Sequence, residues 1–269
     1  MILVFSTEFV CMSKLSVAIT TFNNQATIAS CLQSAEQVAD EIVVLDSGST
    51  DRTLQIIADF DTRVISQPFA GYSAQKQAVI DQCSHDWILL LDSDEVISPA
   101  LIQSILQWKQ SDPQAQGYRI VRVEQMFWQM QHPRSRHNAF LRLFDRRVTA
   151  MSDDLVHESP RTDGAVTELD GGLLHYSETS IELKVDKLNR YSTLWAKQAY
   201  AAGKRSAWWR LSLYPAWYFV RLFFLKRQFF NGWAGFVAAK CGAQYTFWKY
   251  AKLMEHEKKA RANDSDLKV

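Results

Sequence analysis

Two aspartates flank a single serine directly after a strongly apolar run, in the order Asp92-Ser93-Asp94. Carboxylates placed this closely at the end of a strand can converge on one divalent ion. Hard oxygen ligands suit Mg²⁺ or Mn²⁺, which bind proteins through one or two carboxylates and complete their shell with substrate phosphates. Such an ion neutralises the charge that develops on a departing diphosphate. Asp92 and Asp94 are therefore the first candidates for a metal-binding site that handles phosphate.

A second acidic pair brackets a turn of small polar residues. Asp46 ends an apolar run, and Asp51 closes the sequence Ser-Gly-Ser-Thr-Asp at residues 47–51. Carboxylates here can accept hydrogen bonds from a base NH or from ribose hydroxyls. The same residue types are ordinary helix caps, so a purely structural role is the competing interpretation.

Strand and helix patterns alternate through the first hundred residues, which predicts an α/β fold. Apolar runs predict strands at residues 15–20, 41–46, 63–66 and 87–92, and apolar periodicity predicts helices near 28–38, 54–58 and 74–81. This alternation is typical of a parallel sheet with right-handed crossovers. Ligands of such sheets bind at the carboxyl ends of the strands, where Asn23, Asp46 and Asp92 are expected.

The rhythm changes after a helix predicted at residues 99–110. Strands are predicted at 117–123 and 139–144. This half of the domain is expected to shape the acceptor side, meaning the part of the site that binds a second substrate. A helix at 179–201 and further helices across 208–256 follow. We expect one α/β domain over residues 13–178 and a helical, membrane-associating extension over 179–262.

The extension is basic and aromatic. Residues 204–262 contain twelve Lys or Arg against two Glu, and Trp, Phe and Tyr are interleaved with Arg210, Arg221, Lys226 and Arg227. This composition is typical of helices that lie at a membrane surface, with rings at the headgroup level and basic side chains near anionic phosphates. The alternative is a helical hairpin with the aromatics as its core. The acidic surplus of the remaining chain disfavours nucleic acid as a partner.

No run of about 18 uncharged apolar residues is present, so a spanning helix is not expected. The first dozen residues lack the features of a signal peptide, and Met12 is an alternative start. Four widely scattered cysteines indicate neither a zinc site nor a disulfide framework. A reducing cytoplasm is the simplest setting.

Three segments in this order resemble family 2 glycosyltransferases of the GT-A fold, a Rossmann-like mixed sheet that binds nucleotide-diphospho-sugars. They are residues 16–23 (SVAITTFN), 41–51 (EIVVLDSGSTD) and 89–95 (LLLDSDE). Residues 71–77 (GYSAQKQ), 142–144 (RLF), 156–158 (VHE) and 174–176 (LHY) are similar to the branch that adds glucose to the lipopolysaccharide inner core. Gln77 departs from the Asn usual in that branch, and Phe22 departs from the Tyr of many family members.

The resemblance implies an inverting transfer of a hexose from a UDP-sugar donor to a lipopolysaccharide core or lipid-linked saccharide acceptor. It places Asp46 and Asp51 near the uridine, and Asp92 and Asp94 at the metal and ribose. The expected donor-binding residues are Thr21, Asn23, Asp46, Asp51, Lys76, Asp92 and Ser93. A lipid-linked acceptor further implies a cytoplasmic enzyme bound peripherally to the inner face of the bacterial cytoplasmic membrane.

Two cationic side chains and one histidine are further candidates. Lys76 and Arg142 can pair with phosphate oxygens or with a phosphorylated acceptor, and solvated charge is the competing interpretation. His175 can complete the metal shell with Asp92 and Asp94 or contact the diphosphate as a neutral imidazole. A structural histidine at a strand end is the alternative.

The catalytic base is expected in the second half of the chain. An inverting displacement needs a carboxylate that takes the acceptor proton while the hydroxyl attacks the anomeric carbon. Glu158 is the leading candidate, with Asp153 and Asp154 as rivals. A surface carboxylate in a loop is the alternative for Glu158.

Two other classes of function compete. Residues 90–96 (LLDSDEV) satisfy the pattern of haloacid-dehalogenase-type phosphatases, in which Asp92 would be a nucleophile. That family has its motif on the first strand, whereas three predicted strands precede this one. The second rival is a non-catalytic membrane adaptor, which the full set of carboxylates disfavours.

Overall fold

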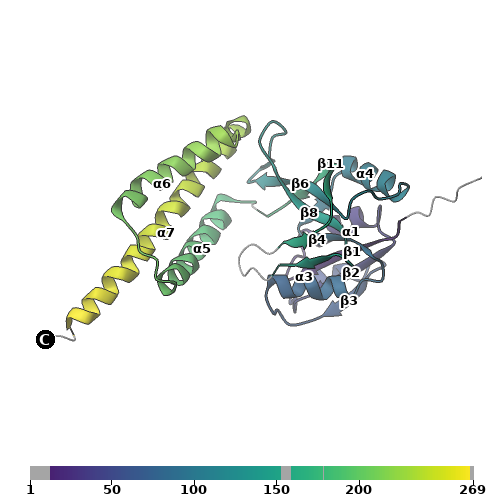
Figure 1. Cartoon of the computed structure of the whole chain (residues 1–269), viewed down its shortest axis with the longest axis horizontal. Coiled ribbons are helices and arrows are strands. Elements are labelled where there is room, and N and C mark those ends of the chain that lie inside the picture. The colour runs from purple at the N-terminus through teal and green to yellow at the C-terminus, as the bar shows by residue number, and fades with distance from the viewer. Residues whose placement is uncertain (1–12, 153–158, 178, 267–269) are drawn as a thin grey trace, which may run out of the picture. The chain divides into compact units, whose positions relative to one another are not determined.

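The computed structural model describes residues 13–152, 159–177 and 179–266, with the side chains of 263–266 excepted. The chain forms two compact units (Figure 1). The first combines Met1–Val123 with Asn138–Tyr176 and contains the sheet. The second combines Glu124–His137 with Ser177–Val269 and contains the C-terminal helices.

The first unit is built on one mixed sheet. Its parallel half has the order β3-β2-β1-β4, with β3 (Arg63–Ser66), β2 (Glu41–Asp46), β1 (Leu15–Thr21) and β4 (Trp87–Asp92). The order continues with β8 (Asn138–Asp145), β6 (Gly117–Met126), β11 (Val166–His175) and β5 (Glu95–Ile97). Strand β8 is antiparallel to β4 and β6, and β11 is antiparallel to β5. The predicted α/β fold with a mixed sheet is confirmed.

The remaining short strands lie off this path. Strand β7 (Gln129–Met130) pairs with β6, and β9 (Thr149–Met151) pairs with β10 (Pro160–Thr162) in a separate two-stranded sheet.

Helices cover both faces of the parallel half, which explains why β1, β2 and β4 are mostly apolar and buried, whereas the edge strand β3 is more exposed. In β4, Leu89 and Leu91 pack in one core cluster, while Ile88 and Leu90 pack in the other. The first cluster is closed by α1 (Ile28–Ala35), α2 (Thr53–Ile57) and α4 (Pro99–Lys109), and the second by α3 (Tyr72–Asp81). Because successive side chains of β4 point to opposite faces of the sheet, each core cluster receives every second residue of this strand.

The second unit is a helical assembly. Its elements are α5 (Ile181–Ala201), α6 (Trp208–Val220), the π-helix η1 (Arg221–Leu225), the 3-10 helix η2 (Gln228–Asn231) and α7 (Gly232–Asp266). Helix α7 contacts both α5 and α6. Lys252 of α7 donates to the Asn189 carbonyl at 2.9 Å and to Ser192 Oγ at 2.7 Å, which joins α7 to α5. Among the described residues, none of the helices combines the length and apolarity needed to cross a bilayer.

The segment Glu124–His137 is a hairpin that contains the end of β6, β7 and the loop to β8, and it belongs to this helical unit, which the sequence did not indicate. Phe127 is 2% exposed and packs with Ala234 and Ala238 of α7. Asn231 Oδ1 accepts a hydrogen bond from the His132 backbone N–H at 2.6 Å, and Asn231 Nδ2 donates to Ser135 Oγ at 2.8 Å. The hairpin is thus held by both apolar and polar contacts. The predicted boundary after residue 178 stays a prediction.

Strand β11 passes close to the N-terminus of α4 at a glycine. Gly171 has φ +92°, and a Cβ there would lie 2.6 Å from Leu101 Cα, well inside van der Waals contact. Ser98, the N-cap of α4, accepts hydrogen bonds at Oγ from Leu101 N at 3.3 Å and from Gly172 N at 3.1 Å. These contacts fix the strand that ends at His175.

We expect Gly171→Ala to destabilise the protein by about 3 kcal/mol, because left-handed backbone strain adds to an overlap with the α4 backbone. Gly48→Ala is the matched control: Gly48 also has positive φ (+94°), but an added Cβ meets nothing within 4 Å. It should cost only about 1 kcal/mol. Thermal unfolding midpoints of the two variants measure the difference, and equal losses would contradict the close approach.

Candidate functional site

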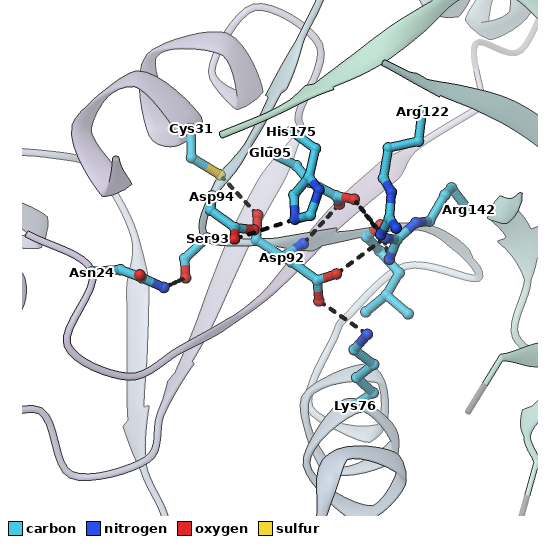
Figure 2. A network of polar contacts seen from close by, with 11 residues as sticks. Asn24, Cys31, Lys76, Asp92, Ser93, Asp94, Glu95, Arg122, Arg142 and His175 are labelled. Carbon is cyan, nitrogen blue, oxygen red and sulfur yellow. Dashed lines mark hydrogen bonds and ion pairs between the residues drawn. The ribbon is translucent and has the colours of Figure 1, made fainter. Parts of the chain in front are cut away.

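Asp92 lies between two cationic side chains at the end of β4 (Figure 2). Its Oδ1 is 3.0 Å from Lys76 Nζ of α3, and its Oδ2 is 3.1 Å from Arg142 Nη2 of β8. The Asp92 side chain is 26% exposed, whereas Lys76 and Arg142 are largely buried. The structure therefore brings three predicted site residues together, and both cations that were expected to bind phosphate bind the carboxylate of Asp92.

Glu95, which was not among the predicted site residues, is buried next to this cluster. Its side chain is fully buried, and Oε1 accepts a hydrogen bond from Arg142 Nη2 at 2.6 Å. Oε2 accepts a hydrogen bond from the Asp92 backbone N–H at 3.0 Å. Arg122 of β6 also approaches Oε1, at 3.7 Å. A sequence signal did exist, since Glu95 directly follows the acidic pair, but an acid in a turn is usually exposed.

The ionisation of this cluster follows from burial and neighbouring charge. Burial alone would raise the pKa of Asp92, but Arg142 and Lys76 hold that pKa well below its usual range. Burial would lower the pKa of Arg142, but the charges of Glu95 and Asp92 raise it above its usual value. Burial raises the pKa of Glu95, and Arg142 opposes this rise. Asp92 thus remains a carboxylate throughout the physiological pH range.

Asp94 and His175 form a second pair at the same edge. His175 Nε2 is 3.2 Å from Asp94 Oδ2, and the Tyr176 backbone N–H donates to the Asp94 carbonyl at 2.9 Å. The register of β11 with β5 sets this pairing, because His175 lies opposite Glu95. The two side chains are 12% and 25% exposed, so a ligand can reach them.

The donor set of this pair fits Mg²⁺ or Mn²⁺. One carboxylate and one imidazole, completed by substrate phosphate and water, suit Mn²⁺, and Mg²⁺ commonly binds through one or two carboxylates. Within the described part of the chain, no group of three or more His, Cys, Asp or Glu is placed to hold a metal ion. Direct ligation by Asp92 stays a prediction, since both of its oxygens contact cations here.

Ser93 and Cys31 border the acidic pair on the side of α1. Asn24 Nδ2 donates a short hydrogen bond to Ser93 Oγ, which ties the loop after β1 to the turn after β4. Cys31 Sγ lies 3.7 Å from the Asp92 carbonyl oxygen. Burial raises the pKa of the Cys31 thiol, and the charges of Glu95, Asp94 and Asp92 add to this rise. Cys31 is therefore a neutral packing residue.

The loop after β2 is organised by its own acids. Asp46 is 1% exposed, and its Oδ2 accepts hydrogen bonds from the backbone N–H groups of Gly48 and Ser49, both at 2.9 Å. Asp51 accepts from Thr53 N at 2.9 Å and from Gln25 N at 3.1 Å. Burial opposes but does not cancel these hydrogen bonds, which lower the pKa of Asp51. Both carboxylates thus hold the backbone of these loops, although the N-cap position of α2 is Arg52 and has no side-chain cap hydrogen bond, and contacts to uridine stay a prediction.

The loop after β1 lies against this one. Asn23 Oδ1 accepts from Thr50 N at 2.8 Å, and the Asn23 backbone adopts φ +52°. Thr21 is 3% exposed, and its Oγ1 has no hydrogen-bond partner in the described structure. Thr21 and Asn23 therefore lie at the carboxyl edge as expected, with one buried hydroxyl unsatisfied.

Helix α3 connects three parts of the site. Gln75, which is 2% exposed, donates from Nε2 to Ser47 Oγ at 2.9 Å in the loop after β2. Gln77 Oε1 accepts from the Met151 N–H at 3.0 Å. The residue that departs from the expected Asn is therefore used to hold β9. The three candidate bases Asp153, Asp154 and Glu158 lie outside the described residues.

Comparisons with known proteins agree with this arrangement. The model of the family "Glycosyl transferase family 2" matches residues 16–158. The lipopolysaccharide core biosynthesis glycosyltransferase LpsC of Rhizobium meliloti (strain 1021) is 34% identical over 264 residues, which cover 94% of this chain and 96% of LpsC. An uncharacterized glycosyltransferase of Rickettsia typhi is 32% identical over 93% of this chain and 90% of its own length.

Solved structures are more distant. S. aureus TarS 1-349, in complex with UDP, aligns with a TM-score of 0.33 and 24% identity over 42% of this chain. The alignment spans only 35% of that chain. A similarity this low adds nothing to the functional argument.

Proposed function

Because the chain belongs to glycosyl transferase family 2, we propose that it transfers a hexose, with glucose as the first candidate, from a UDP-sugar to a lipopolysaccharide or lipooligosaccharide core acceptor. One observation carries the proposal: a carboxylate–imidazole pair and two cations meet around the Asp92–Glu95 turn at the carboxyl edge of the sheet. The near full-length similarity to LpsC supports the acceptor class.

In this proposal, different residues of the site bind different parts of the UDP-sugar donor. Asp94 and His175 would hold Mg²⁺ or Mn²⁺, which when bound neutralises negative charge on the leaving UDP diphosphate. Lys76 and Arg142 lie at the same edge and hold the carboxylate of Asp92, which would face the ribose or the metal. The loops that contain Thr21, Asn23, Asp46 and Asp51 bind the uridine side, with Ser93 beside them.

The acceptor side supplies the base in this proposal. Glu158 takes the proton of the acceptor hydroxyl while that oxygen attacks the anomeric carbon from the face opposite UDP, which inverts the configuration. Asp153 and Asp154 remain the rivals. The family match, which extends to residue 158, includes all three carboxylates.

No observation favours the two rival functions. The phosphatase pattern requires Asp92 as a free nucleophile on a first strand, whereas β4 follows β1, β2 and β3 and both oxygens of Asp92 contact cations. A non-catalytic adaptor does not need the Asp94–His175 pair or the buried charge cluster around Arg142.

The proposal includes peripheral binding to the inner face of the cytoplasmic membrane through α6 and η1. Five residues spaced by 4, 4, 3 and 4 positions lie on one face of this continuous helical stretch, and α6 has no buried residue. These residues, here called the apolar stripe, are Trp209, Leu213, Trp217, Val220 and Phe224, exposed by 37%, 62%, 58%, 39% and 54%.

Two other aromatics of the stretch, Phe219 and Phe223, pack within the unit, whereas Trp208 is 76% exposed. Phe219 and Phe223 stack at 5.4 Å, and both rings contact Phe236 of α7. The two interpretations of the aromatic tail therefore apply to different faces of one helix: one face packs on α7, and the apolar stripe is exposed.

An anionic bilayer is the occupant that fits the charge. Residues 204–254 contain nine Lys or Arg and no Asp or Glu. Aromatic rings between basic side chains suit the headgroup region of anionic lipids, and the uniform positive charge disfavours a second copy of the same surface. A lipid-linked acceptor would lie at that membrane.

Nucleotide-sugar binding tests the donor. We expect UDP-sugars with Mn²⁺ to raise the unfolding temperature by about 5 °C or more at saturating concentration, since ligands stabilise the folded state by mass action. EDTA should remove the metal-dependent part of this shift, and Asp94→Ala should remove it and lower kcat/KM by about 10²-fold or more. A thermal-shift screen across UDP-sugars measures the stabilisation, and a transfer assay measures kcat/KM. Indifference to every UDP species would contradict the proposal.

Replacing each candidate carboxylate by its amide identifies which one acts as the general base. Glu158→Gln should lower kcat by about 10²–10⁴-fold with little change in donor affinity, because the general base acts only in the chemical step. Asp153→Asn and Asp154→Asn are matched controls that should retain activity. Transfer rates with saturating donor and acceptor provide the measurement, and a loss confined to either aspartate variant would move the role to that residue.

Co-sedimentation with lipid vesicles tests the membrane surface. The protein should pellet with vesicles that contain anionic phospholipid and less with neutral vesicles or at high salt. Trp217→Ser combined with Phe224→Ser should weaken binding about a hundredfold or more, because each lost ring removes about 1.5–3 kcal/mol of apolar burial. Leu183→Ser with Leu194→Ser, at exposed positions of α5, is the control. Undiminished binding by the stripe variant would reject this surface.

A further inference from the structure

Glu95 is a fully buried carboxylate one residue beyond the metal-binding candidate Asp94. Burying a charged side chain is costly unless cations and hydrogen bonds compensate it. Glutamate is seldom fully buried, and this one begins β5 directly after the Ser93-Asp94 turn, so its burial calls for a reason in terms of what it contacts.

Both oxygens of Glu95 are used, and each contacts a different part of the site (Figure 2). Oε2 accepts the Asp92 backbone N–H at 3.0 Å, which closes the turn between β4 and β5. Oε1 accepts Arg142 Nη2 at 2.6 Å, with Arg122 Nη1 3.7 Å away. One side chain thus links the acidic turn to β8 and β6.

The arginine nitrogen that Glu95 binds is the same one that reaches Asp92. Arg142 Nη2 lies 2.6 Å from Glu95 Oε1 and 3.1 Å from Asp92 Oδ2. Charge-assisted hydrogen bonds of this length are strong and directional. Glu95 therefore decides where the guanidinium is held, and the guanidinium in turn orients the carboxylate of Asp92.

We propose that Glu95 is a positioning residue for the donor site: it holds the Arg142 guanidinium and the Asp92 backbone in place, so that Asp92 is preorganised before the nucleotide-sugar binds. The inference deepens the proposed function and rests on it. Without Glu95, the guanidinium is drawn to Asp92 alone, and the ordering of the site must take place at the moment of binding, which lowers affinity.

The chemistry of glutamine makes the substitution diagnostic. The Glu95 carboxylate accepts from two donors, Asp92 N–H and Arg142 Nη2. A glutamine amide of the same shape offers one oxygen acceptor and one NH₂ donor, so it can satisfy only one of the two. Glu95→Gln therefore preserves volume and removes one arm of the link.

The chain offers a matched control at the opposite edge of the sheet. Asp40, directly before β2, also accepts one backbone N–H, that of Leu15 at 2.9 Å, and it contacts two cations, Lys109 Nζ at 2.6 Å and Lys14 Nζ at 3.0 Å. Asp40→Asn removes a carboxylate with similar contacts at the amino end of the parallel strands, whereas the site lies at their carboxyl end. It reports the effect of losing such a structural link on stability alone.

The experiment measures UDP affinity by calorimetry with and without Mn²⁺, donor and acceptor KM, and unfolding temperature. Glu95→Gln should weaken UDP binding and raise donor KM about tenfold or more, with a smaller change in acceptor KM. Asp40→Asn should lower the unfolding temperature and leave UDP affinity within about twofold of wild type. If Glu95→Gln loses stability only, as the control does, the role is structural and the inference is overturned.

Arg142→Lys provides a second test if Glu95→Gln does not fold. Lysine keeps the charge but lacks the planar guanidinium, in which Nη2 contacts both carboxylates while Nη1 donates to the Leu90 carbonyl, so UDP affinity should fall to a similar extent. If both single variants fold, the two losses of affinity should be clearly less than multiplicative in the double variant, because both substitutions remove one link. Fully multiplicative losses, or unchanged affinity in Arg142→Lys, overturn the inference. A wild-type protein that binds no UDP would instead overturn the proposed function, and the inference with it.

Discussion

The site depends on one buried guanidinium. Arg142 is 5% exposed and supplies the positive charge that two acidic side chains of the β4–β5 turn require. A charge at this depth is tolerated only when it is paired, and each carboxylate is in turn tolerated because of it. Arg142 comes from β8, whose register places Leu143 opposite Leu89 of β4. The pairing of these two strands and the electrostatics of the site are therefore one constraint: a shift of β8 by one residue would turn Arg142 to the opposite face.

The sequence predicted the parallel half of the sheet well because its signals are local. Continuous apolar strands and periodic helices can be recognised within about ten residues of sequence. They place Asp46 and Asp92 at the carboxyl edge of the sheet. Strand β5 is only three residues long, and β11 contains Gly171, Gly172 and two acids, so neither shows a strand pattern. Their pairing brings His175 to Asp94, a contact between residues eighty positions apart that no local pattern encodes.

The partners of charged residues were harder to predict than their location. Lys76 and Arg142 were expected near phosphate, and they lie at the expected edge, but both contact Asp92. Asp46 was open to two interpretations, and in the structure its own turn occupies the carboxylate. These outcomes follow from rotamers and strand register, which appear only once the elements are assembled. The aromatic tail shows the same limit, because helical spacing marks two apolar faces without indicating which is covered.

The hairpin at Glu124–His137 belongs to the helical unit but interrupts the sequence of the sheet unit, so neither unit is one continuous segment of the chain. The backbone passes between them three times, after Val123, His137 and Tyr176, so no single cut releases either one intact. The hairpin lies within the stretch that matches the family, whereas Ala234 and Ala238, which enclose Phe127, come from beyond it. A recombination event that exchanged only the C-terminal helices between relatives would join a hairpin from one parent to a helix surface from another. A substitution in these helices at the contact with Phe127 is therefore expected to need a matching substitution in a loop about a hundred residues earlier.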